Sequence, residues 1–134
     1  MSSIIVLDTD VLSKDYKRQL PATLGARLAG RSLCITFVTY GEATQWPLLR
    51  GWSPHKRNAL MHWLSDITVL PSDRDVARRW GEISARAKQR GRPRPQNDTW
   101  IAACCLHYGL PLATLNVKDF QDFADHERLT LITA

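Results

Sequence analysis

Short apolar runs alternate with longer segments of helical periodicity along the whole chain. Five runs of mostly apolar residues predict buried strands, at residues 3–7, 33–37, 67–70, 111–115 and 129–133. In the segments between them, apolar residues recur three or four positions apart, as on a helix with one buried face. Strands separated by helices predict an α/β fold: one domain over residues 1–134, with a central, mainly parallel five-stranded sheet flanked by helices.

Capping and breaking residues indicate where the helices begin and end. Six helices are expected, over residues 10–17, 21–30, 39–51, 54–63, 73–90 and 98–109. The box Thr39-x-x-Glu42 is expected to start the third helix, Ser72 to cap the fifth, and Asn97 or Asp98 to cap the sixth.

Composition places the chain among globular proteins. Its 134 residues, 44% of them hydrophobic, suffice for one compact core. The first apolar run stops at Asp8 and no basic segment precedes it, so we expect a cytoplasmic protein with neither a signal peptide nor a membrane span. Cys34, Cys104 and Cys105 form no C-x-x-C motif, so they are expected to be buried, reduced thiols.

Four acidic residues stand at equivalent places in the predicted elements. Each follows a strand or opens a helix: Asp8, Glu42, Asp98 and Asp119. Because parallel strands end at one edge of a sheet, we expect these distant carboxylates to meet there. Two unit charges ~4 Å apart repel by about 4 kcal/mol at an effective dielectric of ~20, so the cluster needs protons or a hard cation. Oxygen ligands favour Mg²⁺ or Mn²⁺.

Each of these acids also has a purely structural interpretation. Asp8 or Asp10 caps the helix that follows, and Glu42 completes a capping box. Asp98 opens a helix whose dipole stabilises any carboxylate, and Asp119 belongs to a turn. The common placement of all four favours the metal site, with Asp10 as an accessory on or just behind the metal shell.

The formal net charge is +5, and the chain outside the four acids is more basic still, with nine acidic against 18 basic residues. An acidic pit within a basic surface suits a phosphodiester substrate. The cations expected to contact its phosphates stand just before Asp98 and beside Asp119: Arg90, Arg92, Arg94 and Lys118. The alternative is a solvated, charged helix end.

Four motifs together resemble those of the PIN-domain ribonucleases, specifically the VapC toxins of bacterial toxin-antitoxin pairs. They are LDTDVLS, TYGEA, NDTWIAA and TLNVKDF, in the order typical of that family and over nearly the whole chain. The resemblance implies that the four acids bind one or two Mg²⁺ or Mn²⁺ ions and that Thr114 and Asn116 support them. One departure is Asp10, where many relatives have Asn or Ser.

The same resemblance implies an activity and partners. We expect a Mg²⁺- or Mn²⁺-dependent endoribonuclease that forms a homodimer and is neutralised by a VapB-like antitoxin, whose C-terminal segment lies across the site. The apolar helices over residues 10–30 and 46–63 are the expected antitoxin groove, and Leu28 is its expected contact residue.

Two other functions fit part of the sequence. IIVLDTDVL also resembles the first motif of the haloacid dehalogenase phosphatases, with Asp8 as nucleophile and Asp10 as acid and base. That interpretation leaves Glu42 and the basic segment unexplained and lacks a convincing lysine motif. The second alternative is a basic protein that binds nucleic acid or a partner without cutting, which predicts salt-sensitive binding and no metal-dependent product.

Overall fold

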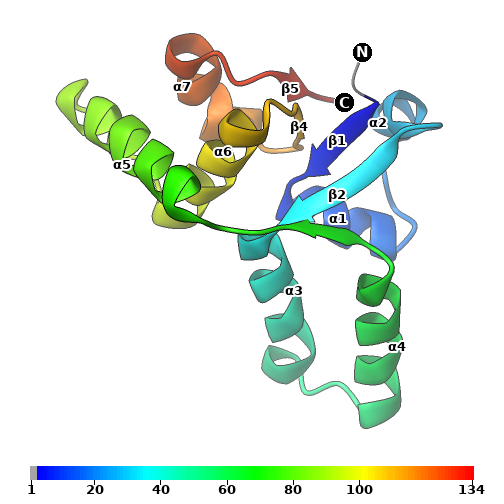
Figure 1. Ribbon diagram of the computed structural model, residues 1–134. Helices are drawn as coiled ribbons and strands as arrows, with labels where there is room; N and C mark the ends of the chain where they lie inside the picture. Colours follow the sequence, from blue (N-terminus) through cyan, green and yellow to red (C-terminus); the bar gives the residue numbers. More distant parts are fainter. Residues whose placement is uncertain (1–2) are drawn as a thin grey trace.

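The computed structural model describes residues 3–134, in which five parallel strands form one sheet (Figure 1). The strands lie in the order β3-β2-β1-β4-β5, and their bounds are β1 (Ile4–Leu7), β2 (Ser32–Thr36), β3 (Thr68–Leu70), β4 (Leu112–Ala113) and β5 (Leu131–Ile132). Each neighbouring pair is parallel. The predicted α/β class is confirmed, and the sheet is entirely rather than mainly parallel.

Seven helices lie within residues 3–134: α1 (Thr9–Tyr16), α2 (Ala22–Leu28), α3 (Phe37–Leu49), α4 (Pro54–Ser65), α5 (Arg74–Gln89), α6 (Gln96–Tyr108) and α7 (Val117–Glu127). Helices α1, α2 and α4 pack on one face of the sheet, and α5, α6 and α7 pack on the other (Figure 1). Among the described residues, every helix is too short or too polar to span a membrane.

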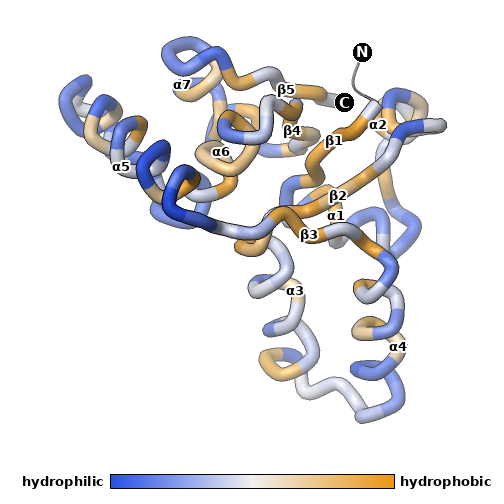
Figure 2. The backbone as a smooth tube through the Cα atoms, viewed as in Figure 1, coloured by the Kyte–Doolittle hydropathy of each residue, from blue (hydrophilic) through white to orange (hydrophobic). Residues whose placement is uncertain are grey.

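Alternation along the central strand β1 divides the core into two parts. Ile5 and Leu7 pack with residues of α1, α2 and α4, whereas Val6 packs with residues of α5, α6 and α7. Because both faces of the sheet are covered, both sets of side chains must be apolar, which explains the continuous apolar runs in the sequence. In Figure 2 β1 and most of β2 are orange, the hydrophobic end of the scale.

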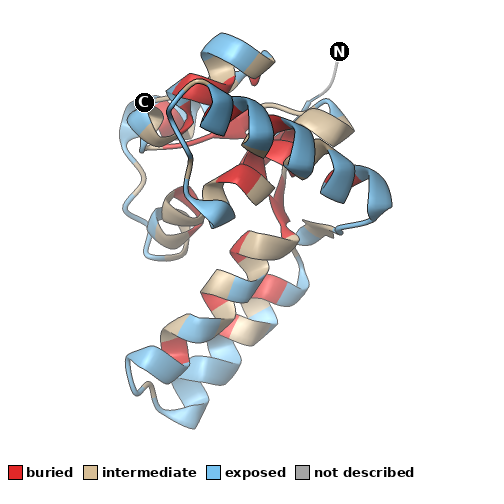
Figure 3. Ribbon diagram, turned by 90° about the vertical axis from the view of Figure 1, so that its left-hand side faces the viewer, coloured by how far each residue is buried: buried red, intermediate tan, exposed pale blue. Residues whose placement is uncertain are grey.

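Helices α3 and α4 project from the sheet as a pair whose far end is largely exposed (Figures 1 and 3). Leu48 and Leu49, at the end of α3, are 63% and 78% exposed. Leu28, by contrast, is 5% exposed and belongs to the core. The expectation that Leu28 lines a surface groove is therefore wrong, whereas apolar side chains are exposed within the range 46–63.

Three expected helix caps are wrong, each by one to three residues. Helix α3 is capped by Thr36, whose hydroxyl accepts a hydrogen bond from the Thr39 N–H at 3.3 Å, so the expected capping box does not form. Thr36 is also the last residue of β2, and its extended backbone lets it end the strand and cap the helix at once. Asp73 rather than Ser72 caps α5, through the Val76 N–H.

Helix α6 begins at Gln96 after Pro95, without a side-chain hydrogen bond at its cap. Neither Asn97 nor Asp98 is therefore the cap, because proline starts this helix by setting the backbone. Helix α7 was not expected at all, although Phe120 and Phe123 are spaced as on one buried helical face. The three cysteines are free and buried, as predicted.

Candidate functional site

The predicted acids converge on one hollow of about 310 Å³, which we call the acidic pocket. Its lining includes Asp8, Glu42, Asp98 and Asp119, together with Asp10. Asp8 follows β1 directly, Glu42 lies in α3 after β2, and Asp119 lies in the first turn of α7 after β4. Parallel pairing of β1 with β2 and β4 therefore brings together residues that are far apart in the sequence.

Asp8 is almost completely buried, with 6% of its surface exposed. One carboxylate oxygen accepts a hydrogen bond from the Thr9 N–H at 2.8 Å, and the other accepts one from the Thr114 hydroxyl at 2.9 Å. Burial, followed by the nearby charge of Asp10, raises the pKa of Asp8 to about 8 from its usual 3.8. The two hydrogen bonds favour the ionised form but do not overcome the loss of hydration.

The end of β4 is tied to the start of α1 by Thr114 and Asn116. The Thr114 hydroxyl, which donates to Asp8, also accepts a hydrogen bond from the Asn116 N–H at 3.0 Å. The Asn116 side-chain amide donates to Asp10 at 2.8 Å. Thr114 and Asn116, expected as supporting residues, thus each hold one acid of the pocket in place.

Thr9 is a site residue that the sequence did not single out. Its hydroxyl donates to Glu42 Oε1 at 2.7 Å and lies 2.9 Å from the Thr39 hydroxyl. A hydroxyl can donate one hydrogen bond, and Thr9 donates its own to Glu42. In the bond between the two threonine hydroxyls, Thr39 is therefore the donor. The only local signal for this role is the position of Thr9 between Asp8 and Asp10.

Asp98 lines the pocket and is partly exposed. Burial raises the pKa of Asp98 to about 6; the charges of Asp119 and Glu42 act in the same direction, and Arg94 opposes them. Asp98 makes no capping hydrogen bond, but it lies in the first turn of α6, where the helix dipole favours a carboxylate as expected. The pocket as a whole carries more negative charge than its surroundings compensate.

The chemistry of the acidic pocket fits a hard divalent cation. The converging charged side chains all present oxygen, and their charge is poorly compensated, as the raised pKa values of Asp8 and Asp98 indicate. Within residues 3–134, no three His, Cys, Asp or Glu side chains already stand close enough to hold a metal ion. The carboxylates keep unused lone pairs, so a cation that draws them together would find ligands.

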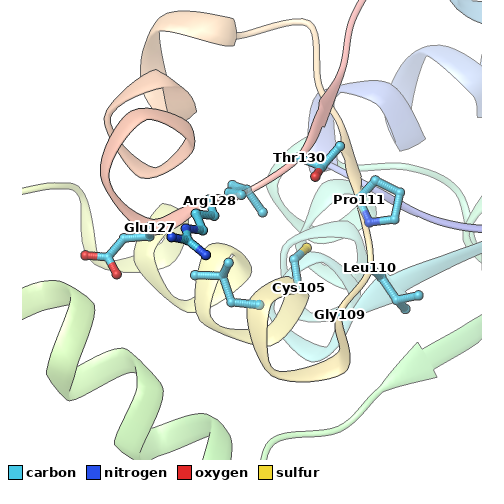
Figure 4. Close-up of a pocket in the computed structure, with 9 residues that line it drawn as sticks. Cys105, Gly109, Leu110, Pro111, Glu127, Arg128 and Thr130 are labelled. Atoms are coloured by element: carbon cyan, nitrogen blue, oxygen red, sulfur yellow. The ribbon is translucent and has the colours of Figure 1, made fainter.

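A second hollow, of about 300 Å³, lies at the opposite end of the sheet, where β4 and β5 begin (Figure 4). The carboxylate in its lining is Glu127, which accepts two hydrogen bonds of 2.9 Å from Arg86. Cys105, also in the lining, is a buried thiol whose pKa burial raises well above its usual value. Glu127 is the one carboxylate in this lining and is already paired with Arg86, so the hollow offers a cation less than the acidic pocket does.

The expected phosphate-binding residues line a separate cleft between α5, the loop after it and α7. Arg90, Arg92, Arg94 and Lys118 all belong to its lining. Arg90 donates to Asp122 at 2.5 Å and lies 3.8 Å from Glu127, so its charge is already balanced within the protein. The other three have no carboxylate within ion-pair distance among residues 3–134.

Comparison with known proteins agrees with the motifs and the pocket. The PIN domain family model matches residues 5–126. Ribonuclease VapC5 of Mycobacterium tuberculosis is 33% identical over 113 residues, covering 81% of this chain and 80% of that protein. Ribonuclease VapC1 of Haemophilus influenzae strain R2866 is 27% identical over 125 residues, covering 91% of this chain and 93% of that protein.

Solved structures give the same picture. VapBC-1 from nontypeable Haemophilus influenzae matches with a TM-score of 0.79 and 26% identity, covering 97% of both chains. VapBC-5 from Mycobacterium tuberculosis, a member of the VapBC family of toxin-antitoxin systems, matches with a TM-score of 0.76 and 27% identity, covering 98% of this chain and 99% of that one. With nearly its whole length matched in sequence and structure, the chain belongs to the PIN-domain family, among the VapC ribonucleases.

Proposed function

We propose that this protein is a metal-dependent endoribonuclease toxin that hydrolyses RNA phosphodiester bonds and is neutralised by a VapB-like antitoxin. The observation that carries the proposal is the convergence of Asp8, Glu42, Asp98 and Asp119 on one pocket. The similarity to proteins named Ribonuclease VapC supports RNA as the substrate.

The four acids would hold one or two Mg²⁺ or Mn²⁺ ions. Such an ion, when bound, lowers the pKa of a coordinated water and stabilises the leaving oxygen of the phosphodiester. The chain's own contribution is positioning: Thr114 holds Asp8, Asn116 holds Asp10, and Thr9 holds Glu42. Asp8 and Asp98 must give up protons to act as ligands, which their raised pKa values make easier at neutral to alkaline pH than in acid.

The proposed partner is a VapB-like antitoxin, and the proposed assembly is a homodimer. The similarity to solved VapBC complexes supports the antitoxin. The exposed Leu48 and Leu49 at the end of α3 are the apolar contacts that the expected groove region offers. The homodimer rests on the family resemblance.

The phosphatase alternative has no observation in its favour, because Asp8 and Asp10 lie in a pocket with three further acids and the matched family is the PIN domain. The non-catalytic alternative requires an experiment. It predicts RNA binding without a metal-dependent product, which the same assay as the main proposal detects.

The test is incubation of purified, antitoxin-free protein with total cellular RNA, in Mg²⁺ or Mn²⁺ and again in EDTA, followed by mapping of new 5′ ends by sequencing. We expect discrete cuts that need the cation and disappear in Asp8→Asn and Asp98→Asn. The matched control is Asp66→Asn, which removes an exposed carboxylate at the end of α4 and should cut like the wild type. Full activity of a folded Asp98→Asn variant, or no cuts by folded wild-type protein, would contradict the proposal.

A further inference from the structure

The cleft between the end of α5, the loop after it and α7 has a volume of about 420 Å³. We call it the basic cleft. Its cations are Arg90, Arg92, Arg94 and Lys118, and its acids are Asp122 and Asp125. The cleft adjoins the acidic pocket, because the loop leads into the first turn of α6 with Asp98 and the first turn of α7 carries Asp119.

The charges in the basic cleft do not cancel. The side chain of Asp122 is 5% exposed, and its charge is compensated by the ion pair with Arg90. Asp125 accepts a hydrogen bond of 2.8 Å from Gln121 and has no ion pair within the described chain. Arg92, Arg94 and Lys118 are therefore opposed by one exposed carboxylate, which leaves an excess of positive charge facing the cleft.

Arg94 is incompletely compensated in its present surroundings. Its Nε is shielded from solvent and has no hydrogen-bond partner within residues 3–134. A guanidinium that loses part of its hydration without gaining a partner is costly, and an anion on its open side would offset that cost. Phosphate groups suit this geometry because they accept several charge-assisted hydrogen bonds at once.

The cations are distributed unequally around the acidic pocket. Lys118 is the neighbour of Asp119 in the first turn of α7, and Arg94 is near enough to Asp98 to oppose the rise of its pKa. The hollow on the other flank, between α3 and α6, is lined by Phe37, Trp100 and other residues, none of them Lys or Arg. An RNA strand that crosses the acidic pocket would therefore meet the basic cleft on the α7 side. On the α3 side it would meet a hollow without cations in its lining.

We propose that the basic cleft binds backbone phosphates of the RNA on one side only of the bond that is cut. Arg92, Arg94 and Lys118 are the phosphate contacts, and Arg90 is structural because it holds Asp122. The identity of the bound strand rests on the proposed ribonuclease function, whereas the anion site rests on the cleft itself.

Binding can be measured without catalysis, in EDTA, with a fluorescein-labelled 12-nucleotide single-stranded RNA at several salt concentrations. Each phosphate contact contributes about 0.7 to the slope of log affinity against log salt for a single strand. We expect Arg92→Gln, Arg94→Gln and Lys118→Gln each to lower the slope by about that amount. The affinity that each variant loses relative to the wild type should therefore be roughly fivefold greater at 0.1 M salt than at 1 M. Arg27→Gln, an exposed position in α2 behind the opposite face of the sheet, should leave the slope unchanged.

Equal slopes for the cleft variants and Arg27→Gln would overturn the anion site, even if the wild type cuts RNA. Reduced slopes without any metal-dependent cutting would leave the site standing and would contradict the nuclease instead. A decaglutamate peptide tests whether the cleft instead recognises an acidic protein segment. If the peptide binds more tightly than the RNA, and if Arg92→Gln, Arg94→Gln and Lys118→Gln each weaken its binding, the proposal is wrong.

One-sided contact is tested by RNAs that carry a single neutral methylphosphonate at successive positions around a mapped cut. We expect slower cleavage for substitutions on one side, over the one or two phosphates that reach the basic cleft. The penalty at those positions should vanish in Lys118→Gln or Arg94→Gln, because the contact is already absent. Equal penalties on both sides of the cut, or penalties that the variants do not change, would contradict one-sided binding.

Discussion

Thr9 joins two acids of the site, because its N–H donates to Asp8 at 2.8 Å and its hydroxyl donates to Glu42 at 2.7 Å. Asp8 follows β1 directly, whereas Glu42 lies in α3, 33 residues after Thr9. One residue therefore fixes the relative position of two proposed ligands that belong to different elements. Thr9 itself lines the acidic pocket, and its bonds to both carboxylates make it a positioning residue.

Thr9→Val keeps the shape of the side chain and the N–H bond to Asp8 but removes the hydroxyl. A hydrogen bond to a charged group is worth about 1.5–3 kcal/mol, so we expect metal-dependent cleavage to fall at least about tenfold under single-turnover conditions. Thr9→Ser restores the donor and should recover most of the rate. A Val variant that binds the ion and cuts like the wild type would show that Glu42 needs no support.

The ionisation of Asp8 should destabilise the fold in the absence of a cation. Burial raises the pKa of Asp8 from 3.8 to about 8, so the unfolded chain releases this proton at lower pH than the folded protein does. Stability is therefore lost as the pH rises from about 4 to about 8, by a few kcal/mol. Asp8→Asn cannot ionise, and its Tm in EDTA should exceed that of the wild type at pH 8 by about 5 °C or more.

Circular dichroism at pH 4 and pH 8 measures this difference. Near pH 4 the two proteins should unfold at similar temperatures, because Asp8 is still protonated in the folded protein and the unfolded chain, with a pKa of 3.8, is only about half ionised, so little stability has yet been lost. Asp66→Asn, at an exposed carboxylate, is the matched control and should follow the wild type at both values. Equal Tm values for Asp8→Asn and wild type at pH 8 would mean that ionisation of the buried Asp8 does not destabilise the fold.

Cation binding should depend on pH in the opposite sense. Mg²⁺ or Mn²⁺ competes with protons on Asp8 and Asp98, whose pKa values burial raises to about 8 and about 6. We expect Mn²⁺ to raise the Tm by several degrees at pH 8 and by much less at pH 5.5, in differential scanning fluorimetry. Asp98→Asn should reduce the gain at pH 8. The same gain at both pH values would place the ion elsewhere.

Two leucine substitutions separate the core from the proposed antitoxin surface. Leu28 is 5% exposed, so Leu28→Glu buries a charge and should cost more than about 3 kcal/mol, seen as poor expression or a large fall in Tm. Leu49 is 78% exposed, so Leu49→Glu should leave the Tm unchanged and weaken capture of the VapB-like antitoxin in a pull-down. If Leu49→Glu captured the antitoxin as well as the wild type does, the end of α3 would not be part of the antitoxin-binding surface.

The helix starts show where local patterns are ambiguous. Thr36 and Thr39 are both plausible caps, and only the backbone shows that the strand ends and the helix begins at Thr36. The polar character of Lys118, Gln121 and Asp125 concealed α7, since these residues occupy its exposed side. A local pattern reports which residues prefer burial, but it does not distinguish a turn from a short helix when the buried contacts come from elsewhere.

The α/β class, the five strands and the four acids that meet at one edge of the sheet could all be predicted from local patterns in the chain. These follow from periodicity and from the rule that parallel strands end together. Three contacts could not be predicted in this way: Thr9 joins Asp8 to Glu42, Thr114 holds Asp8 across 106 residues, and Asp122 balances Arg90. Such contacts depend on strand order and helix packing, because side chains this far apart in the chain meet only after the sheet has assembled.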